Sequence, residues 1–221
     1  MKKNYILPIL IFLTGCTYFN ANSIAPGYFQ AYQAIKNTIV GYENTLITPE
    51  LIENIPYASS MIRIGNGPIG LMILESIKKN ESVWITADEI YFIIKKGKIV
   101  ETKGLPNNLS NLLLPSYFEE TDLNKIGNEV TLTYYYSYDE PELINLEIKA
   151  NYTNMGLDII DILGNEKELT LVEEKISNEY IGWNVVNRYW LDNTCYVWKS
   201  QQHVSPKLPS ISYEITKKPS E

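Results

Sequence analysis

The sequence predicts a mainly β domain, an antiparallel multi-stranded barrel-like or sandwich sheet with one or two short N-terminal helices. Short runs rich in Ile, Val, Tyr and Trp fill residues 61–217, and turn-forming Gly, Asn and Asp lie between them. No helical crossover separates these runs, so neighbouring strands are expected to be antiparallel. Hydrophobic residues make up 45% of the 221 residues, which is enough for a substantial core.

Two helices are expected before the strands. Within residues 26–42, apolar residues recur every three or four positions, the spacing of an amphipathic helix. Further on, the hydroxyl of Thr48 precedes Pro49 and the acidic Glu50. A capping hydroxyl, a proline and an acidic first turn are typical of a helix start. This second, short helix is expected to end before Pro56.

About ten or eleven strands are expected from the alternating apolar runs. Their predicted ranges are 61–65, 68–77, 82–86, 90–95, 129–138, 143–152, 157–163, 169–179, 183–191, 195–202 and 211–217. Residues 154–156, 164–166 and 192–194 carry Asn, Asp and Gly in combinations typical of hairpin turns.

The amino terminus predicts a bacterial lipoprotein. Two lysines precede an apolar run that is about half the length needed to cross a membrane, so residues 1–15 are predicted to be a signal peptide. Leu13-Thr14-Gly15-Cys16 matches the lipobox, in which a peptidase cuts before a cysteine that carries diacylglycerol. Cys16 is therefore the expected lipid attachment site. Residues 16–26 are the expected lipidated tether, and residues 27–221 the single mainly β domain.

The expected anchor is permanent, because a lipoprotein amino terminus carries three acyl chains and stable attachment needs more than one. Thr17 stands where lipoproteins retained in the inner membrane typically have Asp, which favours the outer membrane with the domain facing the periplasm. With Cys16 lipidated, no disulfide can form within the chain. The strand-like surroundings of Cys195 favour a buried, inert thiol.

Composition argues against several classes of function. The formal net charge of −7 and the lack of a Lys- and Arg-rich run disfavour nucleic acid as a partner. His203 is the sole histidine in the sequence, so neither a nucleophile–base pair with Cys195 nor a metal site is predicted. The GxGxxG pattern at residues 65–70 precedes a strand-like run and predicts a hairpin, so no cofactor is expected. No catalytic residue is assigned.

Paired carboxylates leave an enzymatic alternative open. Asp88 with Glu89, Asp158 with Asp161, and Glu173 with Glu174 are the pairs in question. A polysaccharide-modifying enzyme would need two carboxyls about 5–10 Å apart in a cleft. Solvated strand faces and turns also produce such pairs.

Aromatic residues are the remaining candidates for contact with a ligand or partner. The chain has 17 Tyr against 5 Phe. Flat rings with polar tips suit sugar rings, but they also fill barrel interiors and support protein interfaces. A further alternative is an open barrel that binds a lipid or glycolipid, which requires an apolar concavity. The candidate contact residues are Trp84, Tyr134, Tyr136, Trp183, Trp190 and Trp198.

Five blocks of sequence follow one another in a characteristic order. They are the lipobox, residues 48–51 leading into 55–59, residues 84–88, residues 97–105 with 108–109, and residues 187–192 followed by 197–202. Together they resemble the YjbF/GfcB (YmcC-like) family of outer-membrane lipoproteins, over nearly the whole mature chain. One departure is Cys195, where such proteins usually have a turn residue such as Gly.

The resemblance implies a mainly β lipoprotein encoded with exopolysaccharide or group 4 capsule secretion genes. It implies no established catalytic residue, and Cys16 is the one functional position that carries over. An outer-membrane-anchored, non-catalytic accessory role in exopolysaccharide or capsule export or assembly is therefore expected. The expected partners are the outer membrane, through the N-terminal acyl chains, and polysaccharide or secretion-system proteins.

Overall fold

The structure, a computed structural model, describes residues 47–119 and 130–219. Helix α2 (Pro49–Glu53) begins after Thr48, whose Oγ1 accepts a hydrogen bond from the backbone N–H of Leu51 at 3.3 Å. The predicted short helix is therefore confirmed. The predicted helix at residues 26–42, the signal peptide and the tether lie outside the described residues.

Antiparallel strands and the turns between them form most of the described chain, with a short 3-10 helix, η2 (Ser116–Glu119), before the gap. The strands are β1 (Ser59–Ile64), β2 (Gly70–Lys78), β3 (Glu81–Thr86), β4 (Tyr91–Lys95), β5 (Lys98–Lys103), β6 (Leu109–Leu113), β7 (Val130–Tyr138), β8 (Leu143–Ile162), β9 (Asn165–Asn178), β10 (Trp183–Leu191), β11 (Val197–Gln202) and β12 (Ile211–Lys217).

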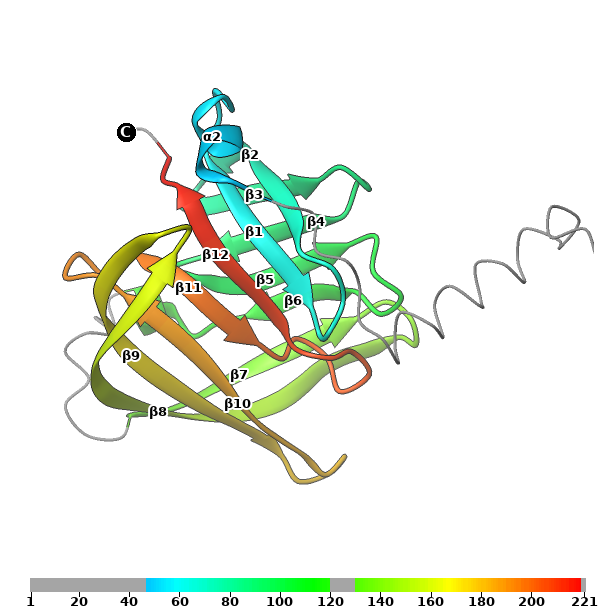
Figure 1. Ribbon diagram of the computed structural model, residues 1–221. Coiled ribbons are helices and arrows are strands. Elements are labelled where there is room, and N and C mark those ends of the chain that lie inside the picture. The colour runs from blue at the N-terminus through cyan, green and yellow to red at the C-terminus, as the bar shows by residue number, and fades with distance from the viewer. Residues whose placement is uncertain (1–46, 120–129, 220–221) are drawn as a thin grey trace, which may run out of the picture. The chain divides into compact units, whose positions relative to one another are not determined.

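All twelve strands belong to one sheet in the order β5-β4-β3-β2-β1-β12-β11-β10-β9-β8-β7-β6. The two end strands, β5 and β6, lie beside each other, so the sheet curls into a nearly closed barrel (Figure 1). At this seam the backbone N–H of Leu109 donates to Thr102 Oγ1 at 2.9 Å. The predicted mainly antiparallel, barrel-like fold is confirmed.

The chain turns around residues 65–70 and 163–164, at or next to the turns that the sequence predicts at 65–70 and 164–166. The chain turns between β1 and β2 at Gly65, which has φ +54°, and Gly67 N–H donates to Ile64 O at 2.9 Å. Leu163 and Gly164 join β8 to β9, both at positive φ, as a two-residue hairpin turn requires.

Residues 154–156 are not the hairpin turn that the sequence predicts. Strand β8 runs through them, and Met155 is an extra residue in a bulge between Asn154 and Gly156. Gly156, at φ +90°, supplies the left-handed conformation that lets the strand bend and continue. The two strands predicted at 143–152 and 157–163 are therefore one.

Strands β5 and β6 were missing from the prediction because polar residues interrupt their short apolar patterns. The sequence of β5 is KIVETK, with three charged residues, and that of β6 is LSNLL, with Ser110 and Asn111 between leucines. The residues of both strands that face the barrel interior are nevertheless buried, among them Thr102, Leu109 and Leu112.

Side chains fill the barrel interior. Its largest fully buried members include Trp84, Phe92, Tyr134, Tyr136, Tyr152, Tyr189 and Tyr213. A second, smaller core lies on the outer face, where the far end of the β8–β9 hairpin bends across the sheet (Figure 1). Ile160, Ile162 and Leu169 of the hairpin pack there with Trp190. In the described ranges no helix has the length and hydropathy to cross a membrane.

Candidate functional site

A polar cluster lies at the centre of the filled interior, around Glu174 of β9. Tyr152 on β8 and Asn187 on β10 are the direct cross-strand partners of Glu174, so all three side chains face the same way. Tyr152 Oη donates to Glu174 Oε1 at 2.5 Å, and Asn187 Nδ2 donates to Oε2 at 2.8 Å. Tyr134 and Tyr189 add hydrogen bonds of 2.7 Å each.

Lys98 of β5 supplies the opposite charge. Its Nζ lies 2.6 Å from Glu174 Oε1 and 2.7 Å from Oε2. Burial lowers the pKa of Lys98, although Glu174 opposes this. Burial alone would raise the pKa of Glu174, but the Lys98 ammonium and the hydrogen bonds from Lys98, Tyr134 and Tyr152 outweigh it and hold that pKa below its usual value.

Three of the predicted contact residues belong to this interior. Tyr134 and Tyr136 are 0% and 1% exposed, and their rings lie 5.5 Å apart. Trp183 is also buried, 5.8 Å from the ring of Tyr136. These rings pack against one another and offer no surface to a ligand, because alternate residues of β7 point into the barrel.

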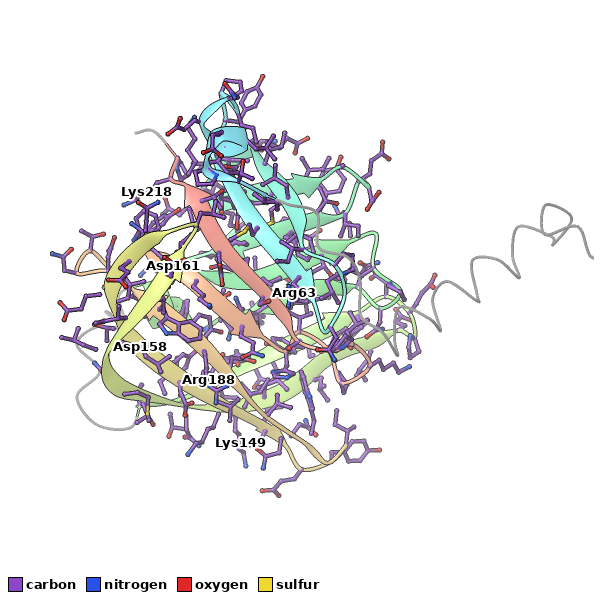
Figure 2. All side chains as sticks on the ribbon, viewed as in Figure 1. Arg63, Lys149, Asp158, Asp161, Arg188 and Lys218 are labelled. Carbon is purple, nitrogen blue, oxygen red and sulfur yellow. The ribbon has the colours of Figure 1, made fainter. Side chains whose placement is uncertain are left out.

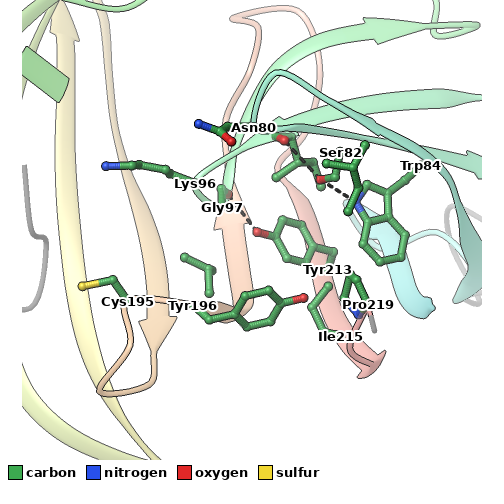
Figure 3. A pocket seen from close by; sticks show the side chains of 13 residues that line it. Asn80, Ser82, Trp84, Lys96, Gly97, Cys195, Tyr196, Tyr213, Ile215 and Pro219 are labelled. Atoms are coloured by element: carbon green, nitrogen blue, oxygen red, sulfur yellow. Dashed lines mark hydrogen bonds between the residues drawn. The ribbon is translucent and has the colours of Figure 1, made fainter. Parts of the chain in front are cut away.

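Trp84 is buried as well, at one end of the barrel. Its Nε1 donates to Ser82 Oγ at 2.9 Å, and it lines a mostly apolar pocket of about 210 Å³ with Val197, Tyr213 and Ile215 (Figure 3). Tyr213 Oη donates to Gly97 O at 2.8 Å at the inner side of this pocket. Since the interior beyond it is filled, this pocket does not make the barrel an open lipid-binding cavity.

Cys195 is half-buried at the rim of the same pocket. It lies in the turn before β11 and not in a strand, with φ +65° and its N–H donating to Asp192 O at 3.0 Å. The predicted buried strand position is therefore wrong. A left-handed turn position is one that favours glycine, so the cysteine side chain is strained there.

The remaining two candidates, Trp190 and Trp198, point to the outer face, where Trp190 is only 9% exposed because it packs in the second core under the bent hairpin. Trp190 Nε1 donates to Asp158 Oδ2 at 2.7 Å, which ties β10 to the bent hairpin. Trp198 Nε1 donates to Asp192 Oδ2 at 2.9 Å, and Lys167 Nζ lies 3.9 Å from the centroid of the Trp198 ring. Both indoles are thus held in fixed orientations by charged neighbours.

An open groove of about 340 Å³ begins beside Trp190. It crosses the outer face of β1, β11 and β12, the face seen in Figure 2, where Arg63 and Asp158 are labelled. Lys199 and Glu214 form a 2.7 Å ion pair in it, and Lys199 Nζ lies 5.4 Å from the Trp190 ring centroid. The lining residues are Met61, Ile62, Arg63, Ile69, Trp190, Lys199, Gln201, Ser212, Tyr213 and Glu214.

This groove differs chemically from the pocket in Figure 3. It combines an aromatic ring with guanidinium, ammonium, amide, hydroxyl and carboxylate groups. A ligand with many hydroxyls matches such a set of donors and acceptors. The groove is therefore the candidate binding site of the described chain.

The carboxylate pairs do not form a common site. Glu173 and Glu174 face opposite sides of β9, and Glu173 pairs with Arg188 on the outside at 2.9 Å. Asp158 is bonded to Trp190, whereas Asp161 accepts a hydrogen bond from Gly164 N–H in the hairpin turn. Asp88 lines a small separate pocket.

The other catalytic and metal candidates are also dispersed. Cys195 and His203 lie beyond opposite ends of β11, which separates them by roughly 20 Å at the usual rise of a strand. Among residues 47–119 and 130–219, no group of three or more His, Cys, Asp or Glu is placed to hold a metal ion.

Sequence reasoning missed Lys98 and Glu174 as central residues and Arg63, Lys199 and Gln201 as groove residues. A signal existed for Glu174, because it occupies an inward position between Val172 and Ile176 in a strand of period two. The groove had no such signal, since its residues come from strands far apart in the sequence.

The fold and groove define the class of protein, a mainly β, barrel-like domain with a filled interior and a polar groove on its outer face. Residues 32–216 match the family described as "Group 4 capsule polysaccharide lipoprotein gfcB, YjbF", and the chain belongs to that family.

Individual relatives agree over nearly the full length. The chain is 20% identical to the uncharacterized lipoprotein YjbF of Escherichia coli K12 over 207 residues, 92% of each chain. It is 20% identical to the uncharacterized lipoprotein GfcB of the same organism over 197 residues, 87% of each. The crystal structure of the hypothetical lipoprotein YmcC from E. coli K12 matches with a TM-score of 0.66 and 18% identity. That match covers 85% of this chain and 96% of YmcC, and it shows the shared fold.

Proposed function

We propose that this protein is an outer-membrane-anchored periplasmic lipoprotein with a non-catalytic accessory role in capsule or exopolysaccharide export or assembly. Cys16 carries the acyl chains that hold it in the membrane, and Thr17 directs it to the outer membrane. Membership of a capsule lipoprotein family supports a role in capsule or exopolysaccharide export or assembly. Neither a cofactor nor nucleic acid is part of the proposal.

The observation that carries the proposal is the outer groove beside Trp190. Saccharides present many hydroxyls that need both donors and acceptors, and Arg63, Gln201 and Glu214 provide them along one open surface. A groove open to solvent suits a chain better than a closed pocket does, because a polymer must continue past the site in both directions. The proposed ligand is therefore a segment of the exported polysaccharide.

Deletion of the gene, with an assay of surface polysaccharide, tests the role. The deletion strain is expected to lose surface polysaccharide, and wild-type protein to restore it. Arg63→Ala is expected to restore much less, whereas Lys103→Ala, an exposed lysine outside the groove, should restore it fully. Immunoblots should confirm equal protein levels. Unchanged polysaccharide in the deletion strain, where the gene is normally expressed, would contradict the role.

A separate arm tests the anchor. Cys16→Ala should abolish acylation, release the mature domain from the outer-membrane fraction or leave the precursor unprocessed, and reduce restoration. If Arg63→Ala restores polysaccharide as well as wild type does, the groove is not the site, even where the deletion phenotype holds.

A further inference from the structure

Three reactive side chains meet at one buried oxygen inside the barrel. Lys98 Nζ lies 2.7 Å from Glu174 Oε2, and Asn187 Nδ2 lies 2.8 Å from the same atom. All three residues are at most 2% exposed. An amine, a carboxyl group and a primary amide are therefore held together where water does not reach.

We propose that Lys98 and Asn187 become joined by an intramolecular amide bond, with Glu174 as the proton carrier. Lys98 passes a proton to Glu174, and the neutral Nζ attacks Asn187 Cγ. As the Nζ–Cγ bond forms and the Cγ–Nδ2 bond breaks, Glu174 returns that proton to the departing nitrogen and takes up the second proton of Nζ, which leaves with the ammonia as ammonium. One ammonia leaves for each bond formed, so the reaction needs no oxidant, metal or external reactant.

The carbonyl oxygen of Asn187 is positioned for this attack. Oδ1 accepts a hydrogen bond from the backbone N–H of His203 at 2.7 Å and lies 3.2 Å from His203 Nδ1. With its proton on Nδ1, the imidazole donates a second hydrogen bond to Oδ1. The backbone N–H, joined by the imidazole in that tautomer, stabilises the negative charge that develops on Oδ1 when a nucleophile adds to Cγ.

The surroundings favour the neutral amine of Lys98, whereas the lowered pKa of Glu174 makes its protonated form a short-lived one that readily gives up its proton. Burial lowers the pKa of Lys98, which makes an uncharged, nucleophilic amine more accessible. Tyr134 and Tyr189 lie 3.3 Å from Nζ and hold the amine in place. A single turnover in the lifetime of the protein is sufficient, so the rate can be slow.

The proposed bond has a structural purpose in this fold. Strand β5 ends the sheet order and forms no ladder with β6, whereas β10 lies inside the sheet between β11 and β9. A covalent link between Lys98 and Asn187 ties this end strand across the interior to β10. The link would hold the seam closed without a disulfide.

Tryptic peptide mapping of the full-length protein, purified from membranes and denatured before digestion, tests the proposal. A linked chain yields residues 97–103 joined to 176–188, with cleavage blocked after Lys98 and a mass about 17 Da, one ammonia, below the sum of the two peptides. An unlinked chain yields residues 99–103 and 176–188 separately. Complete recovery of the separate peptides from folded wild-type protein overturns the proposal.

Two variants define the roles. Lys98→Arg removes the nucleophile and should give only unlinked peptides. Glu174→Gln keeps a similar shape but cannot accept the proton, so linkage should fall at least tenfold in protein whose circular dichroism remains that of the wild type. Full linkage in folded Glu174→Gln would contradict the role of Glu174. If Glu174→Gln does not fold, Asn187→Asp tests whether residue 187 supplies the carbonyl carbon of the link. Its link forms with loss of water in place of ammonia, so the linked peptide mass is then about 18 Da below the sum of the two peptides.

Discussion

Tyr134 donates a 2.7 Å hydrogen bond to Glu174 Oε1 in the barrel interior, while the next residue, Tyr135, points to the opposite face of β7. Two adjacent tyrosines thus have different surroundings, one in the polar cluster and one half-exposed. Part of the tyrosine surplus is explained by this cluster, since three tyrosine hydroxyls donate to Glu174. Phenylalanine fills the same space but donates no hydrogen bond.

Tyr134→Phe is expected to destabilise the fold by about 1.5–3 kcal/mol, because it removes a hydrogen bond to a buried charged group. Tyr135→Phe is the matched control and should change stability by no more than about 0.5 kcal/mol. Urea unfolding followed by tryptophan fluorescence measures both. Equal effects of the two substitutions would show that the Tyr134 hydroxyl contributes nothing specific.

Asp192 should make stability depend on pH. Partial burial alone would raise its pKa, but hydrogen bonds from the side chains of Thr194 and Trp198 and from backbone N–H groups hold the pKa below its usual value. Its contribution is therefore complete above the unfolded pKa of about 3.9 and is lost as pH falls through the lower folded pKa. Between pH 6 and pH 3, the free energy of unfolding should fall less for Asp192→Asn than for wild type. The difference is the pH-dependent contribution of the Asp192 carboxyl. Parallel urea titrations at both pH values measure the difference, and identical losses would exclude it.

The turn at Cys195 gives a test of backbone geometry. Cys195→Gly should change stability by no more than about 1 kcal/mol, because relief of the left-handed strain is offset by greater freedom in the unfolded chain. Cys195→Val places a β-branched residue at φ +65° and should cost about 1–3 kcal/mol. The measurement is the urea concentration at the midpoint of unfolding, compared between variants whose m-values are equal. A valine variant as stable as the glycine variant would mean that the turn adopts another conformation in solution.

Much of the fold was predictable from local pattern. The Thr48 cap and the hairpins at Gly65 and Gly164 depend on residues that lie next to each other, so the sequence alone indicates them. The bend at Gly156 was misread because a glycine at positive φ serves a turn and a bulge equally well. Strand β5 was missed because burial of its Lys98 and Thr102 depends on partners from other strands of the barrel, and β6 because Ser110 and Asn111 interrupt its short apolar run.

The functional residues were less predictable than the strands. Trp190 was a candidate, but its groove partners Arg63 and Glu214 come from β1 and β12, the first and last strands of the described chain. The Lys98–Glu174 pair is likewise formed by residues 76 positions apart. No pattern of spacing within one segment encodes such contacts, because they depend on the order in which the strands pair.

The seam between β5 and β6 has a mechanical consequence. Side chains such as Thr102 bridge it, whereas every other neighbouring pair of strands shares a backbone ladder. Separating β5 from β6 therefore breaks fewer backbone hydrogen bonds than separating any other neighbouring pair. In a chain without the Lys98–Asn187 link, a pull on the barrel wall would part it along this line first, and the amides of β5 would exchange with solvent before those of β10.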